Sequence, residues 1–310
     1  MNKFTKFALA ATVATYFLIF VGGLVRVSGA GMGCPDWPTC FGRWIPPTSI
    51  SQLPANIDPA QFNFALAWIE YVNRLIGMTV GILIAITAIW SLLSYRKYLR
   101  IVIPALLAAL LVAYQGWQGS RLVATQLDPM IVSIHMGLAF IIAGLMMYVT
   151  QQTFYLNRDV IKIIDRREGG LHWWIIVLAI TSLIQVISGT QIREAMEAAI
   201  ASFPLLNEAE IMTRVGWVQY FHTILGILVV LITWQTGTRI LRQTKGKSAM
   251  ISQITIAAII TVTLQLIVGP LTILFTTVKI AQLFHLLLSA LHFGFVILIF
   301  SALRIEGRSV

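Results

Sequence analysis

Long apolar stretches separated by short polar connections run through the whole chain, and they predict helices that cross a membrane. A bilayer-spanning helix needs about 20 predominantly apolar residues, and eight stretches approach or exceed that length. The predicted spans cover residues 7–26, 67–93, 101–120, 130–152, 171–190, 217–238, 249–270 and 281–303. Because the bilayer core offers no water to bond backbone groups, each stretch should be an α-helix. The pattern therefore predicts an all-α integral membrane protein with eight transmembrane helices.

The last four spans repeat small and polar residues of the first four. In the second span of each half a tyrosine precedes a glycine by six positions, Tyr71 with Gly77 and Tyr220 with Gly226. The other matched pairs are Gly22 with Gly189, Arg26 with Arg193, Gln115 with Gln265, Gly119 with Gly269, and His135 with His285. Apolar helices can match by coincidence, but repeated polar positions favour an internal duplication. Four spans per half then predict two four-helix bundles related by a pseudo-twofold axis along the membrane normal.

The duplication gives an N-terminal bundle at residues 1–153, a charged linker at 154–170 and a C-terminal bundle at 171–310. Basic residues are retained on the cytoplasmic side, so their distribution predicts orientation. One set of span ends carries 15 of the 22 basic residues: Lys3, Lys6, Arg96, Lys97, Arg100, Arg158, Lys162, Arg166, Arg167, Arg239, Arg242, Lys245, Lys247, Arg304 and Arg308. Both termini and the linker are therefore expected in the cytoplasm.

Composition agrees with a polytopic membrane protein, with 58% hydrophobic and 11% charged residues. The net charge of +10 invites a nucleic-acid partner, but the basic residues alternate with the spans and form no single patch. The first span could be a secretory signal, yet no small-residue cleavage site follows it. An organelle leader rich in Arg and Ser is also missing, so the expected location is a bacterial cytoplasmic (inner) membrane.

The second span contains ionisable residues within its apolar run. Charge inside a membrane is costly, so Glu70 and Arg74 are functional candidates. Helical spacing places Glu70, Asn73, Arg74 and Gly77 on one face, with a gap beside the glycine. Glu70 is a candidate proton acceptor. The alternative is an ion pair with Arg74 or Arg26 that only holds the bundle.

Histidines inside the spans are candidate ligands of haem iron. His222 and His285 lie at similar depth in the second and fourth spans of the second half, as two axial ligands of one macrocycle would. In the first half, His135 matches His285, but Asn73 occupies the position that matches His222. An iron held by His135 would therefore have one open coordination position. The alternative for each is a hydrogen-bonded core histidine, which is our interpretation of His292.

Two further groups lie at the outer ends of the spans. Arg26, Arg121 and Arg193 are candidate partners of haem propionates, or alternatively interfacial anchors. Cys34 and Cys40 lie in one loop outside the membrane and are expected to form a disulfide. This bridge is either a staple that orders the loop or a dithiol relay for electrons.

Taken together, these motifs resemble the haem A synthase family over nearly the whole chain. The resemblance rests on the loop Gly31-Met32-Gly33-Cys34-Pro35-Asp36-Trp37-Pro38 after a span ending Gly22-Gly23-Leu24-Val25-Arg26, on Glu70-Tyr71-x-x-Arg74, and on the duplication. It implies an oxidoreductase that converts the C8 methyl group of haem O to a formyl group by successive hydroxylations. The product, haem A, supplies cytochrome c oxidase.

The resemblance also implies roles for the candidate residues. His222 and His285 would hold a resident haem b, and the bundle with Glu70 and His135 would receive haem O. Asn73, Arg74 and Gly77 would line the substrate pocket. The family commonly has histidine at the position of Asn73, so this chain would bind substrate iron through His135 alone.

Partners and alternatives follow from the same residues. The resemblance implies haem O as substrate, an electron donor or acceptor that the sequence does not identify, and haem O synthase as a candidate partner. One alternative function is a b-type electron-transfer cytochrome with two histidine ligands, in which no haem is chemically changed. The other is a transporter with parallel repeats, which would bind no haem.

Overall fold

Eight long helices make up most of the chain in the computed structural model, which describes residues 1–156, 170–245, 248–274 and 279–305. They are α1 (Lys3–Ser28), α2 (Phe64–Ser94), α3 (Leu99–Ala124), α4 (Pro129–Tyr155), α5 (Leu171–Ser202), α7 (Trp217–Thr244), α8 (Ala249–Leu274) and α9 (Lys279–Ile305). All eight are long and apolar enough to cross a membrane, which confirms the predicted spans. Most of the predicted linker, with Arg158, Lys162, Arg166 and Arg167, lies outside the described residues, as do Lys247 and Arg308.

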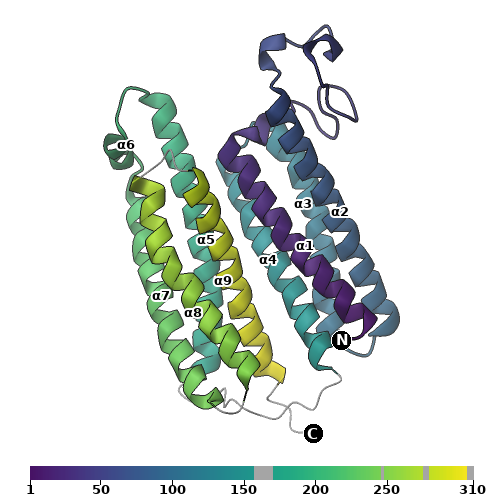
Figure 1. Ribbon diagram of the computed structural model, residues 1–310, viewed down its shortest axis with the longest axis vertical. Helices are drawn as coiled ribbons and strands as arrows, with labels where there is room; N and C mark the ends of the chain where they lie inside the picture. Colours follow the sequence, from purple (N-terminus) through teal and green to yellow (C-terminus); the bar gives the residue numbers. More distant parts are fainter. Residues whose placement is uncertain (157–169, 246–247, 275–278, 306–310) are drawn as a thin grey trace.

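The helices form two side-by-side bundles (Figure 1). In the first, α1 and α3 each pack against α2 and α4; in the second, α5 and α8 each pack against α7 and α9. The bundles meet through the first and fourth helix of each, because α4 contacts α5 and α9 while α1 contacts α9. The same order of neighbours in both bundles agrees with a duplication. The pseudo-twofold axis itself stays a prediction.

Loops of very different length lie at one end of the bundles, called here the loop end. A segment at residues 29–63 covers the first bundle there, and the short helix α6 (Glu208–Arg214) lies over the second (Figure 1). The long segment contains three short 3-10 turns, Ala30–Met32, Ile50–Gln52 and Pro59–Gln61. The N-terminus and the last described turn of α9 lie together at the opposite end (Figure 1). An even number of spans requires this arrangement.

Polar residues cap the helices that begin at the loop end. The Asp128 carboxylate accepts hydrogen bonds from the backbone N–H groups of Met130 and Ile131, and Pro129 occupies the first turn of α4. Asn63 caps α2 by accepting from the N–H of Leu66. These caps satisfy N–H groups that the helices cannot bond themselves. They fix the starts of the two helices that carry Glu70 and His135.

Helix α5 is longer than its apolar pattern predicted. The predicted span ended at residue 190, but the helix continues to Ser202. The sequence that follows the apolar stretch is rich in alanine and glutamate, which favour helix even outside a membrane. Glu194 and Glu197, which lie beyond the predicted end of the span, are therefore part of the helix.

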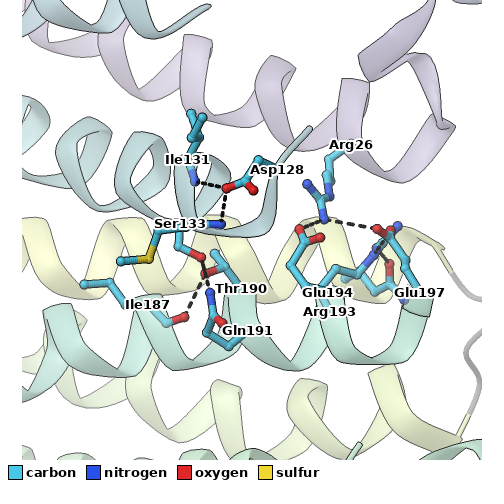
Figure 2. Close-up of polar contacts among 12 residues, drawn as sticks. Arg26, Asp128, Ile131, Ser133, Ile187, Thr190, Gln191, Arg193, Glu194 and Glu197 are labelled. Carbon is cyan, nitrogen blue, oxygen red and sulfur yellow. Dashed lines mark hydrogen bonds and ion pairs between the residues drawn. The ribbon is translucent and has the colours of Figure 1, made fainter. Parts of the chain in front are cut away.

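The interface between the bundles is apolar in its middle and polar at both ends. Its centre is a cluster of buried side chains from α1, α4 and α9: Ile19, Phe140, Ala143, Ala290 and Phe293. At the loop end, Ser133 bonds Thr190 and Gln191, and Arg26 pairs with Glu194 (Figure 2). At the opposite end the Gln152 amide donates to the Ser301 hydroxyl at 2.9 Å. These contacts fix the relative position of the two candidate sites.

Candidate functional site

The second bundle brings His222 of α7 and His285 of α9 together. Their ring centres are 6.3 Å apart with an angle of 57° between the planes. Sequence reasoning predicted that these residues face each other, and the structure places them so. The two helices occupy opposite corners of the bundle, so the rings meet in its interior.

Helix α5 orients the His222 ring. The Ser188 hydroxyl lies 2.9 Å from Nδ1, and the Gln185 amide nitrogen lies 3.2 Å from Nε2 and donates to the His222 carbonyl at 3.0 Å. A hydrogen bond at one ring nitrogen sets which nitrogen is free to bind a metal. The contact with Ser188 would leave Nε2 as the nitrogen available to a metal, and a ligand bound there would displace the Gln185 amide from its present position.

Glycines on the neighbouring helices make room for both rings. A Cβ added at Gly189 of α5 would lie 3.0 Å from Cε1 of His222, and one added at Gly269 of α8 would lie 3.4 Å from Cε1 of His285. Both glycines belong to the pairs matched by the repeat. The distance at Gly189 is shorter than an ordinary contact and favours glycine there, whereas the distance at Gly269 is an ordinary van der Waals contact.

Replacing Gly189 by Ala should therefore tilt the His222 ring and weaken the binding of any group to its Nε2. A displaced supporting contact typically lowers metal affinity by about 10- to 100-fold. The haem content of purified protein, measured by pyridine haemochrome, checks this. Gly116→Ala is the matched control, because nothing among the described residues beyond its own helix lies within 4 Å of the added atom. Equal haem content in both variants would contradict the role of Gly189.

The same hydrogen bond occurs in each bundle, at the histidine of its fourth helix. The Gln265 amide of α8 donates to the His285 carbonyl at 3.1 Å, and the Gln115 amide of α3 donates to the His135 carbonyl at 2.8 Å. In both histidines Nδ1 is buried and has no hydrogen-bond partner among the described residues. His135 and His285 therefore share this amide contact, but the Ser289 hydroxyl also donates to the His285 carbonyl, and Ala139 stands at the matched position of the first bundle.

The histidine pair fits a haem better than a bare metal ion. The described part of the chain contains no group of three or more His, Cys, Asp or Glu that could hold an ion. A macrocycle supplies four iron ligands itself and needs only two from the protein. Two imidazoles bonded to one metal ion at about 2 Å hold their ring centres about 6 Å apart. The observed 6.3 Å agrees with that value.

The first bundle lacks the second histidine and is more open. Asn73 of α2 lies where His222 lies in the second bundle, and its buried Oδ1 has no hydrogen-bond partner among the described residues. The Cβ position of Gly22, which matches Gly189, is 4.0 Å from that oxygen. Among the described residues, nothing beyond its own helix lies within 4 Å of a Cβ at Gly77. The gap predicted beside Gly77 is confirmed.

Glu70 is buried beneath the loop of residues 34–40, with 5% of its surface exposed. One carboxylate oxygen pairs with Arg74 at 2.5 Å, and the other accepts from the backbone N–H of Cys34 at 2.8 Å. Arg74 in turn donates to the carbonyls of Asp36 and Thr39, at 2.9 and 2.8 Å. The predicted ion pair with Arg74 is therefore present, and it also binds the loop to α2.

Cys34 and Cys40 form the predicted disulfide. Both sulfur atoms are buried in a cluster with Phe41 and Ala67. Gly33 lets the loop approach α2, since a Cβ there would lie 2.3 Å from the Leu66 carbonyl oxygen. The disulfide thus closes the loop, while the contacts of Glu70 and Arg74 and the close approach at Gly33 hold it against α2.

The three arginines at the loop end have different environments. Arg26 pairs with Glu194 and, at 3.2 Å, with Glu197, and Arg193 bonds Glu197 at 2.7 Å (Figure 2). Arg193 also donates to the side-chain oxygen of Gln282. Arg121 is exposed and makes no ion pair among the described residues. The sequence did not predict these partners. A haem propionate that bound Arg26 or Arg193 would have to displace them. A propionate role for the three arginines stays a prediction.

The interpretation of His292 agrees with the structure, whereas two residues that contact His222 were not predicted. His292 is 4% exposed and its Nδ1 lies 3.2 Å from the Ala258 carbonyl, as a packed core histidine would. Gln185 and Ser188, which contact His222, were missed. Their spacing of three on the span that carries Gly189 was the available signal, because it places them on one helix face.

These features define a multi-pass membrane protein of two four-helix bundles, with a histidine pair in one and a more open, related site in the other. The sequence profile described as "cytochrome oxidase assembly protein" matches residues 5–297. The chain belongs to this family.

Three curated relatives of this chain are named heme A synthase. That of Lysinibacillus sphaericus is 26% identical over 306 residues, which is 94% of this chain and 93% of the relative. That of Bacillus cereus strain G9842 is 27% identical over 290 residues, covering 91% and 87%. That of Geobacillus kaustophilus is 25% identical over 229 residues, covering 73% and 68%.

Proposed function

We propose that this chain is a haem A synthase, which oxidises the C8 methyl group of haem O to a formyl group by successive hydroxylations. Family membership and the printed names of its relatives support the reaction. The observation that carries the proposal is the difference between the bundles, since one has two facing histidines and the other has His135 with Asn73. One bundle is suited to hold a haem permanently, and the other to admit a substrate.

In the second bundle, His222 and His285 hold a resident haem b. Ser188 fixes the His222 tautomer, and Gly189 and Gly269 leave space for the rings. A haem with two histidine ligands supplies one-electron transfer when bound. Arg193 and Arg26, at the loop end of the same interface, are the candidate propionate partners, with Arg121 serving the first bundle.

In the first bundle, His135 binds the iron of haem O, and Asn73, Arg74 and Gly77 line the pocket. Asn73 is a poor iron ligand, so one iron position stays open for oxygen chemistry. Glu70 accepts the proton released from the C8 methyl group, and Arg74 stabilises the carboxylate between turnovers. Because both residues also hold the Cys34–Cys40 loop, proton transfer at Glu70 is coupled to the contacts that seat the loop.

The membrane location and orientation of the chain are part of the same proposal. The chain lies in a cytoplasmic membrane with both termini in the cytoplasm, so the loop end and the Cys34–Cys40 disulfide face the oxidising side. The charge distribution of the connections supports this orientation. An electron donor or acceptor and haem O synthase are the expected partners, since the substrate must arrive from the enzyme that makes it.

Expression in a host that makes haem O but not haem A tests the function. Haems extracted from the purified chain are separated by chromatography and identified by mass. We expect haem A or its hydroxymethyl precursor beside haem b. Haem b with unaltered haem O would instead favour an electron-transfer cytochrome, and a colourless protein would favour a transporter.

A further inference from the structure

Gln118 of α3 is a buried polar residue without a bonding partner. Only 3% of its surface is exposed, and its Oε1 has no hydrogen-bond partner in the part of the chain that the structure describes. Within the described residues its side chain makes no hydrogen bond. Buried amides in native proteins are nearly always bonded, so each exception needs a cause, and one cause is a ligand.

The position of Gln118 places it in the candidate substrate bundle. It lies one turn from Gln115 on the same face of α3, and the Gln115 amide donates to the carbonyl of His135. The next residue, Gly119, faces the disulfide loop, because its Cβ position is 3.9 Å from Nε1 of Trp37. Gln118 therefore lies between the level of His135 and the loop that covers this bundle.

The second bundle has no such amide. Gln115 and Gly119 are repeated as Gln265 and Gly269, but Val268 stands where Gln118 would be matched. The two matched positions on either side are thus kept, while the polar group between them is present only in the first bundle. A cause for Gln118 must therefore be sought in what the first bundle binds and the second does not.

The two haems of the proposed function differ in the hydrogen-bonding groups that they offer to an amide. Haem b carries no hydroxyl group, and the methyl group of haem O that reacts forms no hydrogen bond. The first hydroxylation converts that methyl into a hydroxymethyl group, which donates one hydrogen bond and accepts others. An amide provides both complements, since its oxygen accepts and its nitrogen donates.

We propose that Gln118 binds the hydroxymethyl group of the intermediate and retains it for the second oxidation. This inference rests on the proposed function and names a residue for one of its stages. The amide has no partner while the methyl substrate is bound, and it gains one when the alcohol forms. The intermediate is therefore held more tightly than the substrate, and the chain completes both oxidations before release.

Gln118→Met tests this, because methionine matches the length of glutamine and removes only the hydrogen-bonding groups. In the haem O host, we expect the ratio of hydroxymethyl haem to haem A in the membranes to rise about five- to tenfold, as loss of one hydrogen bond predicts. Total oxidised haem should fall by less. Gln118→Val, which copies the second bundle, should give the same ratio if the first variant is poorly produced.

A binding measurement separates retention from rate. Hydroxymethyl haem extracted from these membranes is titrated into the purified proteins beside haem O. The wild-type protein should prefer the alcohol by about tenfold, and Gln118→Met should bind both alike. Gln151→Met is the matched control, since Gln151 is also buried without a partner but lies on α4 near the end opposite the loops. It should behave as the wild type.

Three outcomes would overturn the assignment. The first is an unchanged ratio in Gln118→Met while the wild type makes haem A. The second is a rise of equal size in Gln151→Met. The third is weaker binding of haem O itself with an unchanged ratio, which would place Gln118 at the hydroxyl of the farnesyl-bearing side chain. Failure of the proposed function is distinct, because the wild type would then form no oxidised haem.

Discussion

Replacing Glu70 by Gln should lower haem A formation by about 10²- to 10⁴-fold while the resident haem keeps its spectrum, the range that a lost general base gives. Glutamine has the same shape and still accepts from the Cys34 N–H, so the loop should stay in place. It cannot take a proton. The measurement is the haem composition of purified protein from a haem O host, with the reduced spectrum recorded on the same sample.

Arg74→Gln distinguishes proton transfer from the anchoring of the loop. It breaks the same ion pair and also removes the contacts to the carbonyls of Asp36 and Thr39. We expect this variant to expose the Cys34–Cys40 loop to proteolysis yet retain more activity than Glu70→Gln. If Glu70→Gln opened the loop as much and lost no more activity than Arg74→Gln, Glu70 would be an anchor and not a base.

Replacing His222 or His285 by Ala should remove the resident haem. Loss of an axial ligand is expected to weaken binding by more than about 100-fold, since even supporting contacts are worth 10- to 100-fold. Either single variant should therefore lose nearly all of the haem b measured by pyridine haemochrome. The helices should persist, because apolar burial and not the two rings holds the bundle together.

His292→Gln is the control for removing a buried histidine from α9. Its ring contacts the Ala258 carbonyl and not the pair, so haem b content should match that of the wild type. Loss of haem in this variant, together with its retention in His285→Ala, would reverse the assignment of the ligand on α9.

The sequence predicted the helices and the histidine pair because each depends on local pattern. The length of each apolar stretch determines a span. The repeat alone aligns His222 with Asn73 and His285 with His135. The end of α5 was missed because hydropathy reports membrane depth and not helix length. Glu194 consequently lies on a helix and pairs with Arg26, although it falls beyond the predicted end of the span at residue 190.

Contacts between distant segments could not be predicted in the same way. Glu70 was correctly paired with Arg74, four residues away, but its bond to the N–H of Cys34 depends on how the loop folds back over α2. Gln118 gave a weak signal, a glutamine where the second half has Val268. Its significance depends on burial without a partner, which only the packed helices reveal.

The central claim is that the two bundles bind haem differently, one closed by two histidines and one open beside His135. Electron paramagnetic resonance of the Glu70→Gln variant, purified from a haem O host so that substrate accumulates, tests it most directly. We predict one low-spin haem that is lost in the added His222→Ala variant, and one high-spin haem that is lost with His135→Ala. Two low-spin haems, or a high-spin signal that survives His135→Ala, would contradict the account.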